Sequence, residues 1–240
     1  MKDNLQDLIE YTYGLGVIDL VKVVGTDKQT TISAIAEDKT VVVEGTFKTP
    51  LADFIGTFGM PNLAKLKTIL GFEDYDEHAK ISVTRNKDDV PSAVHFETKA
   101  GDFVNDYRLM AKAIVEEKVK EVKFKGATWN VEFEPTVAGI MRLKKQASAN
   151  SEENNFTTKT DKGDLKIYFG DASTHSGNFV FHPDVEGTLS RAWQWPVKVF
   201  LAIMDLPGSK VVRISDQGAA EVTVDSGLAT YRYLLPAQSK

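Results

Sequence analysis

The segment GIMRLKKQASAN (139–150) carries cations and no carboxylate in a chain that is acidic overall. No Asp or Glu lies between Glu134 and Glu152, whereas the 240-residue chain has a formal net charge of −5. Apolar residues recur at helical spacing through this region and predict a helix over 135–150. An ordinary surface helix mixes both signs of charge, because opposite charges three or four residues apart stabilise it.

Three further stretches are predicted to be helices, namely 3–14, 60–71 and 195–208. The second places Pro61 in its first turn and lies in a segment, 54–72, that has no acid. The last is opened by Pro196 and has only Asp205 near its end. One acid-poor helix alone is more typical of an ordinary solvated face. Three of them in an acidic chain favour a polyanion as partner.

The candidate phosphate contacts are the Lys and Arg residues of these three helices: Lys65, Lys67, Arg142, Lys144, Lys145 and Lys198. Lys and Arg contact phosphates without regard to base sequence. No aromatic residues are interleaved with them, so we expect contact with a duplex rather than single-strand readout. The helix over 3–14 departs from the pattern because it carries Asp3, Asp7 and Glu10. Lys22 on the next strand is therefore added as a candidate.

The rest of the chain predicts short β-strands rich in β-branched residues. They span 16–25, 30–38, 40–47, 80–85, 92–99, 106–111, 155–161, 164–171, 177–184, 209–215, 219–225 and 228–235. Each half then shows a helix, strands, a second helix and strands again. We predict an α+β fold with two similar domains, 1–112 and 127–240. The linking segment 113–126 suits either a helix or an extended connector, and its place between similar halves favours the extended form.

Charge and composition narrow the class of protein. Residues 1–112 hold 13 Lys and Arg against 18 Asp and Glu, and residues 113–240 hold 16 of each, so the acidic excess lies in the first half. The chain has no cysteine, which excludes disulfides and thiolate metal sites. The N-terminal MKDNLQDLIEYTYG (1–14) carries three acids and is unlike a secretory signal. No apolar run approaches a membrane span, so we expect no membrane association.

No catalytic constellation is visible, and we expect neither enzyme activity nor a cofactor. The four histidines are scattered, and none has a metal-ligand spacing. The acidic cluster EDYDE (73–77) is a candidate cation site, although a solvated loop is the simpler interpretation. RAWQWP (191–196) suits a sugar-stacking platform or packing at a strand-to-helix corner, and packing is the better interpretation.

At this level the sequence resembles DNA sliding clamps, the polymerase processivity factors, and is most similar to the T4-type bacteriophage clamp. Three segments carry the resemblance, at 34–70, 133–149 and 227–238. The first resembles a strand–strand–helix block, the second lies where an inner helix of the second domain belongs, and GLATYRYLLPAQ (227–238) resembles the terminal strand and tail. The resemblance is one of layout and short phrases over nearly the whole chain.

The resemblance implies a clamp fold, in which each domain has two inner helices packed on outer antiparallel sheets. Three chains would close into a ring, with the helices lining a channel for duplex DNA. It implies a DNA polymerase and a clamp loader as partners, late-transcription factors as further partners, and the cytoplasm of an infected bacterial host as the location. An acidic exterior around a positive channel is consistent with the net charge.

The resemblance also implies an apolar pocket for partner peptides beside the connector and the C-terminal tail. The matching residues are Val119, Val122, Phe124, Leu234, Leu235 and Pro236. The alternative is that these are ordinary core residues of a strand. For the whole protein, the alternative function is a β-rich phage structural protein or a ligand-binding β-sandwich, neither of which has a reason to keep acid-free helices.

Overall fold

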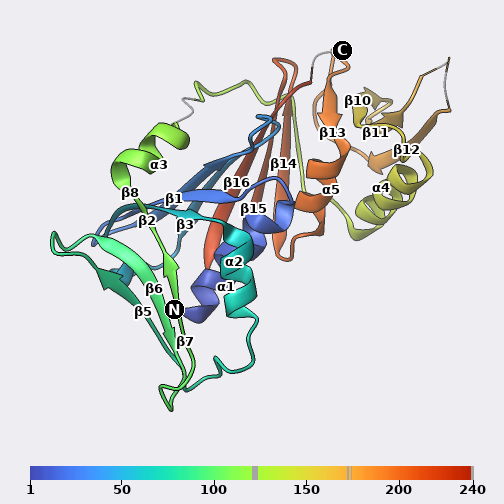
Figure 1. The fold of residues 1–240 in the computed structure, drawn as a ribbon. Coiled ribbons are helices and arrows are strands. Elements are labelled where there is room, and N and C mark those ends of the chain that lie inside the picture. The colour runs from blue at the N-terminus through green and yellow to red at the C-terminus, as the bar shows by residue number, and fades with distance from the viewer. Residues whose placement is uncertain (121–123, 172, 174, 239–240) are drawn as a thin grey trace. The chain divides into compact units, whose positions relative to one another are not determined.

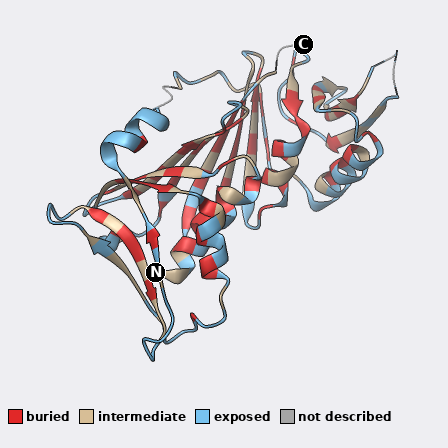
Figure 2. Ribbon diagram, in the orientation of Figure 1, coloured by how far each residue is buried: buried red, intermediate tan, exposed pale blue. Residues whose placement is uncertain are grey.

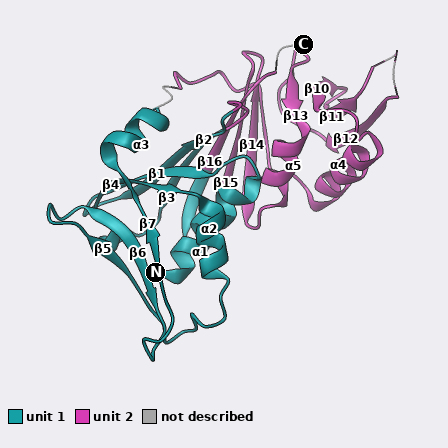
Figure 3. Ribbon diagram, viewed as in Figure 1, with its two compact units in different colours: residues 1–37, 42–122, 226–231 teal, residues 38–41, 123–225, 232–240 magenta. Residues whose placement is uncertain are grey.

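The computed structural model describes residues 1–120, 124–171, 173 and 175–238 of the chain. It divides into two compact units (Figure 3). Unit 1 comprises residues 1–37, 42–122 and 226–231, and unit 2 comprises residues 38–41, 123–225 and 232–240. Both units are discontinuous in sequence. The domain limits expected from the sequence, 1–112 and 127–240, stay a prediction.

All four predicted helices form, together with one that was not predicted (Figure 1). The α-helices are α1 (Lys2–Tyr11), α2 (Leu63–Leu70), α3 (Lys112–Lys118), α4 (Val137–Ala149) and α5 (Val197–Asp205), with 3-10 turns η1 (Tyr13–Leu15) and η2 (Ala52–Phe54). The prediction of an extended connector is wrong over α3 (Lys112–Lys118), which is helical. Val115 of this helix is buried, and Lys112 pairs with Glu116 one turn on at 3.9 Å, so local pairing and burial favour the helix.

Unit 1 contains two antiparallel sheets. In the larger one, the strand order is β8-β4-β1-β2-β3, followed by the first residues of β16. Its strands are β1 (Leu20–Gly25), β2 (Thr30–Ile35), β3 (Val42–Phe47), β4 (Gly56–Pro61), β8 (Met110–Ala111) and β16 (Ala229–Pro236). The smaller sheet has the order β5-β6-β7, with β5 (Lys80–Arg85), β6 (Pro91–Glu97) and β7 (Val104–Arg108).

One face of the larger sheet in unit 1 carries the N-terminal helix. Val23, Ile32 and Gly45 lie opposite one another across β1, β2 and β3. A Cβ atom at Gly45 would lie 3.1 Å from the ring of Tyr231, so that ring occupies the same face. The Tyr231 hydroxyl donates a 2.6 Å hydrogen bond to Asp7 of α1. α1 therefore packs on the Val23 face of the sheet.

The acidic character of α1 has a structural explanation. Asp7 is only 8% exposed and lies beneath the sheet rather than in solvent. Burial raises the pKa of the Asp7 carboxyl, although the hydrogen bond from Tyr231 opposes the shift. Tyr11, one turn further along α1, stacks on Tyr231 with ring centroids 4.7 Å apart. Of the three acids in this helix, only Asp3 and Glu10 are exposed.

The start of α2 differs from the sequence-based expectation. Pro61 ends strand β4, which was not predicted, and does not open the helix. Asn62 is the N-cap instead, in the left-handed conformation with φ of 54°. Its side-chain oxygen accepts a hydrogen bond from the Lys65 amide at 3.2 Å, which satisfies one of the free donors of the first turn.

Unit 2 also contains two antiparallel sheets. One has the order β16-β15-β14-β9, with β9 (Val131–Phe133), β14 (Ser209–Ser215) and β15 (Ala219–Asp225). The other has the order β12-β11-β10-β13, with β10 (Asn155–Asp161), β11 (Asp164–Phe169), β12 (Gly177–His182) and β13 (Gln194–Pro196). β9 and β13 have only three residues each, too few for a periodic signal in the sequence.

α4 is seated closely on the four-stranded sheet of unit 2. Leu143 and Ala147 are buried on one side of the helix, and the other side is exposed (Figure 2). Thr136 caps its N-terminus by accepting a hydrogen bond from the Gly139 amide at 3.0 Å. A Cβ atom at Gly139 would lie 2.3 Å from the backbone oxygen of Phe181 in β12. Glycine at this position therefore allows the helix to approach the strand.

We predict that Gly139→Ala destabilises the protein, although alanine is the better helix former. The added methyl group meets backbone that cannot rotate away, so we expect a loss of about 1–3 kcal/mol in the free energy of unfolding, measured by denaturant titration. The control is Ala138→Gly at the exposed neighbouring position, which should lose about 1 kcal/mol through helix propensity alone. A stabilised Gly139→Ala variant would contradict the close seating of α4.

Candidate nucleic-acid interface

The exposed side of α2 carries its two lysines. Lys65 and Lys67 are both exposed, while Leu63 and Leu66 of the same helix are fully buried. The ammonium group of Lys67 lies 5.6 Å from the ring centroid of Tyr13, within the range of a cation–π contact. α2 and the strand before it contain no carboxylate. Positive charge therefore faces solvent on this helix without a compensating acid of its own.

The three cations of α4 are all exposed but differ in their partners. Arg142 donates a hydrogen bond of 3.4 Å to the backbone oxygen of Val180 in β12. Lys144 forms an ion pair of 2.5 Å with Asp205, the last residue of α5. Lys145 makes no ion pair in the described part of the chain. The three side chains therefore differ in whether a neighbouring group already engages their charge, and among the described residues Lys144 alone of the three is paired with a carboxylate.

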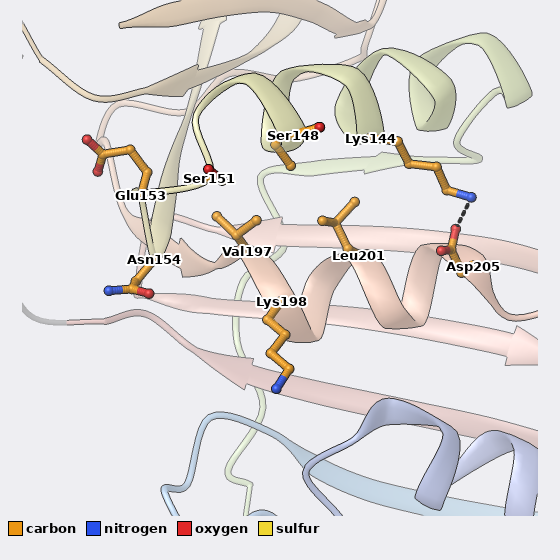
Figure 4. A pocket seen from close by; sticks show the side chains of 10 residues that line it. Lys144, Ser148, Ser151, Glu153, Asn154, Val197, Lys198, Leu201 and Asp205 are labelled. Atoms are coloured by element: carbon orange, nitrogen blue, oxygen red, sulfur yellow. Dashed lines mark ion pairs between the residues drawn. The ribbon is translucent and has the colours of Figure 1, made fainter. Parts of the chain in front are cut away.

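A groove of about 490 Å³ lies between α4 and α5 (Figure 4). Ser148 and Ser151 contribute polar groups from the α4 side, and Asn154 follows them. Figure 4 shows Val197 and Leu201 of α5 on its floor. None of these groove residues was predicted from the sequence. Only Ser148 had a signal, because it lies one helical turn after Lys144 on the same side of α4.

Lys198, on the first turn of α5, also lines the groove and is exposed. In Figure 4 its side chain leaves α5 on the side away from α4. No carboxylate occurs between Glu186 and Asp205 in the sequence. α4 and α5 of unit 2 thus combine four exposed cations with one exposed carboxylate.

Lys22 lies on the face of its sheet that is turned away from α1, and its contact with DNA stays a prediction. Successive residues of a strand point to opposite faces, and the buried Val21 and Val23 lie on the α1 face. Lys22 lies opposite Gly59 in the register of β1 and β4. A Cβ atom at Gly59 would lie 2.8 Å from Val115 of α3. Lys22 therefore shares the α3 face of the sheet and not the face of α1.

The residues expected to form a partner-peptide pocket are placed differently from one another. Val122 lies outside the described residues. Val119, at the end of α3 in unit 1, is only 4% exposed. Leu234 and Leu235 are 5% and 1% exposed in β16, so the prediction of an exposed apolar tail is wrong for both. Successive side chains of a strand point to opposite faces of the sheet. Because both leucines are buried, both faces of the sheet are covered at this point of β16. Of Leu234, Leu235 and Pro236, only Pro236 is exposed.

Phe124 is half-buried and held by aromatic and charged neighbours within unit 2. Its ring stacks on Trp129, with centroids 6.1 Å apart. The guanidinium of Arg232 lies 5.3 Å from the ring centroid of Phe124. Arg232 is fixed in turn by a 2.5 Å ion pair with the buried Glu221. Phe124 therefore links the last residues of the connector to Trp129 and to Arg232 of β16.

We predict that Leu235→Ala lowers the free energy of unfolding by about 2–5 kcal/mol, because it removes a fully buried side chain. Pro236→Ala, one residue later but exposed, is the matched control and should change stability by no more than about 0.5 kcal/mol. Thermal or chemical denaturation measures both. Equal, small effects would show that Leu235 belongs to an accessible pocket after all. Deletion of the tail from 234 onward removes core and cannot test partner binding alone.

The two tryptophans of RAWQWP (191–196) have structural roles. Trp195 is 1% exposed and donates a hydrogen bond of 2.9 Å to Thr158. Trp193 donates to the backbone oxygen of Asp216 at 2.9 Å. Packing at the corner before α5 is therefore confirmed for RAWQWP. Among the described residues, no group of His, Cys, Asp and Glu could hold a metal ion, and no helix has the length and apolarity to cross a membrane.

The arrangement of two helix pairs on antiparallel sheets matches the fold of known sliding clamps. The chain is similar to A. fulgidus PCNA, solved with the C-terminal region of FEN-1 bound, with a TM-score of 0.72, 11% identity, and coverage of 100% of this chain and 96% of that one. For proliferating cellular nuclear antigen from Entamoeba histolytica the TM-score is 0.69, with 14% identity, covering 99% and 94%. For PCNA from Thermococcus kodakaraensis the corresponding values are 0.66, 10%, 99% and 95%.

No protein-family model and no curated protein matches the sequence. The solved structures are nevertheless matched over almost their full length. The chain therefore has the PCNA-like clamp fold, as the resemblance of sequence layout implied. At 10–14% identity, this likeness defines the fold and leaves function to be argued from the residues of this chain.

Proposed function

We propose that this protein is a sliding clamp, a ring of identical subunits that encircles duplex DNA and tethers a replicative DNA polymerase. The observation that carries the proposal is the clamp fold, matched over 100% of this chain and 96% of the first comparison structure. The task is topological and needs no catalytic group. A clamp loader, which opens the ring around DNA, is part of the proposal, as is a trimeric state.

The charge distribution supports a duplex as the ligand. Lys65 and Lys67 of α2, Lys145 of α4 and Lys198 of α5 are exposed on helices that hold few or no acids, while the whole chain is acidic. Such cations contact phosphates regardless of base sequence, which permits sliding. Ser148 and Ser151 extend this polar surface along the groove of unit 2.

The sheet edges support self-association. β7 is a terminal strand of the three-stranded sheet, and β12 is a terminal strand of the four-stranded sheet. Phe103, just before β7, and Val104, its first residue, are 38% and 47% exposed. An open strand edge flanked by apolar side chains is a template for pairing with another chain. We propose that β7 of one copy pairs with β12 of the next, a head-to-tail contact that closes a ring.

Light scattering over a range of concentrations tests the ring. We expect a species close to three times the 26.5 kDa of the chain at high concentration. Val104→Lys should shift the distribution toward monomer, because it places a charge on the proposed seam. Thr84→Lys on β5, the opposite edge of the same sheet, is the control and should leave the mass unchanged. A strict monomer at every concentration would contradict the ring.

The triple variant Arg142→Ala, Lys144→Ala, Lys145→Ala tests the DNA-facing assignment. We expect it to fold normally but to lose at least about tenfold in loading or in retention on circular DNA, since three phosphate contacts are removed. The matched control replaces Lys28, Lys87 and Lys99, three exposed turn lysines, with alanine. It changes net charge equally and should behave as wild type. Equal retention of both variants would contradict the assignment.

The finer features of the proposal come from the sequence resemblance. They are a T4-type phage origin, the cytoplasm of an infected bacterium as the location, and interaction with late-transcription factors. Copurification with the polymerase and clamp loader of the same genome tests the partners. If the protein is instead a β-rich structural or ligand-binding protein, the wild-type chain should not be retained on closed circular DNA after incubation with the clamp loader. Release from a linearised circle is the result expected of a topological tether.

A further inference from the structure

The exposed pair between Lys144 and Asp205 crosses the groove of unit 2. The Lys144 ammonium and the Asp205 carboxylate are 2.5 Å apart, and their side chains are 43% and 50% exposed (Figure 4). Asp205 is the only acid in α4 or α5. The one carboxylate of these two helices therefore forms an ion pair with one of the cations proposed to contact duplex DNA.

The position of Asp205 is not explained by helix stability. It is the last residue of α5, where the negative end of the helix dipole disfavours a carboxylate. Lys210, the other nearby cation, donates hydrogen bonds to the backbone oxygens of Leu206 and Gly208 at the same helix end. Lys210 thus compensates the helix end, and the direct ion pair of Asp205 is with Lys144.

We propose that Asp205 is a built-in counterion that competes with DNA phosphates for Lys144 and so limits the grip of the clamp on duplex. This rests on the proposed function. An exposed ion pair has a small net stability, because solvent screens it and both side chains lose freedom. A passing phosphate can therefore displace Asp205, and Asp205 can recapture Lys144 when the phosphate leaves. Asp205 is a positioning residue that sets how many cations are engaged at once.

The chain offers a matched control for charge alone. Glu153 lines the same groove as Asp205. In the described part of the chain Glu153 takes part in no ion pair. Asp205→Asn and Glu153→Gln thus remove one negative charge each from one groove. Only the first releases a lysine.

The experiment measures binding of a fluorescently labelled duplex of about 30 base pairs at several KCl concentrations. Each added phosphate contact steepens the plot of log affinity against log salt by about 0.9. We expect Asp205→Asn to show this steepening and to bind more tightly at low salt. Its advantage over wild type should then fall about threefold between about 50 and about 150 mM KCl. Glu153→Gln should keep the wild-type slope.

A double variant separates the release of Lys144 from other effects. In a Lys144→Ala background, Asp205→Asn should leave the slope unchanged. Equal slopes for Asp205→Asn, Glu153→Gln and wild type would overturn the proposal, as would a steepening that persists without Lys144. Unchanged melting temperatures confirm that each variant is folded. Retention on circular DNA is scored separately, so a clamp that encircles DNA but shows no Asp205 effect refutes only this inference.

Discussion

The seating of helices on sheets is the constraint on which the proposed binding surface depends. α4 presents cations to solvent only because its opposite side is fixed, with Leu143 buried and Gly139 against the backbone of β12. The same holds in unit 1, where Leu63 and Leu66 hold α2 in place and turn Lys65 and Lys67 outward. The buried side of a helix determines which of its charged residues face solvent. The buried residues of these helices thus determine where the charge lies.

The sequence predicted the elements whose signals are local. Four helices, most strands and the α+β class follow from apolar periodicity and turn residues. Over 113–126 it left a helix and an extended connector open and favoured the extended form, whereas the structure has the helix α3 at Lys112–Lys118 with Val115 buried. Lys22 alternates with the buried Val21 and Val23, but a single strand does not show which helix covers each face of its sheet.

The candidate site shows a similar division. The exposure of the cations on α2, α4 and α5 could be read from helical spacing, since their apolar neighbours define the buried stripe. The pairing of Lys144 with Asp205 joins residues 61 positions apart and depends on how α4 and α5 pack. Likewise, the tail leucines have the composition of an exposed patch but complete a sheet. Identity of 11% with a clamp of the same fold shows how loosely sequence constrains this architecture.

The last strand of the chain has a consequence for biosynthesis. Residues 226–231 belong to unit 1, whose other residues all lie before 123, and Tyr231 reaches Asp7 across 224 positions. A ribosome that has completed residue 122 has therefore not yet delivered the strand that covers α1. At about 5–20 residues per second, the remaining stretch takes roughly 5–20 s to synthesise. During that interval the buried side of the N-terminal helix lacks Tyr231. Unit 1 therefore emerges first but cannot be completed until residues 226–231 have been synthesised.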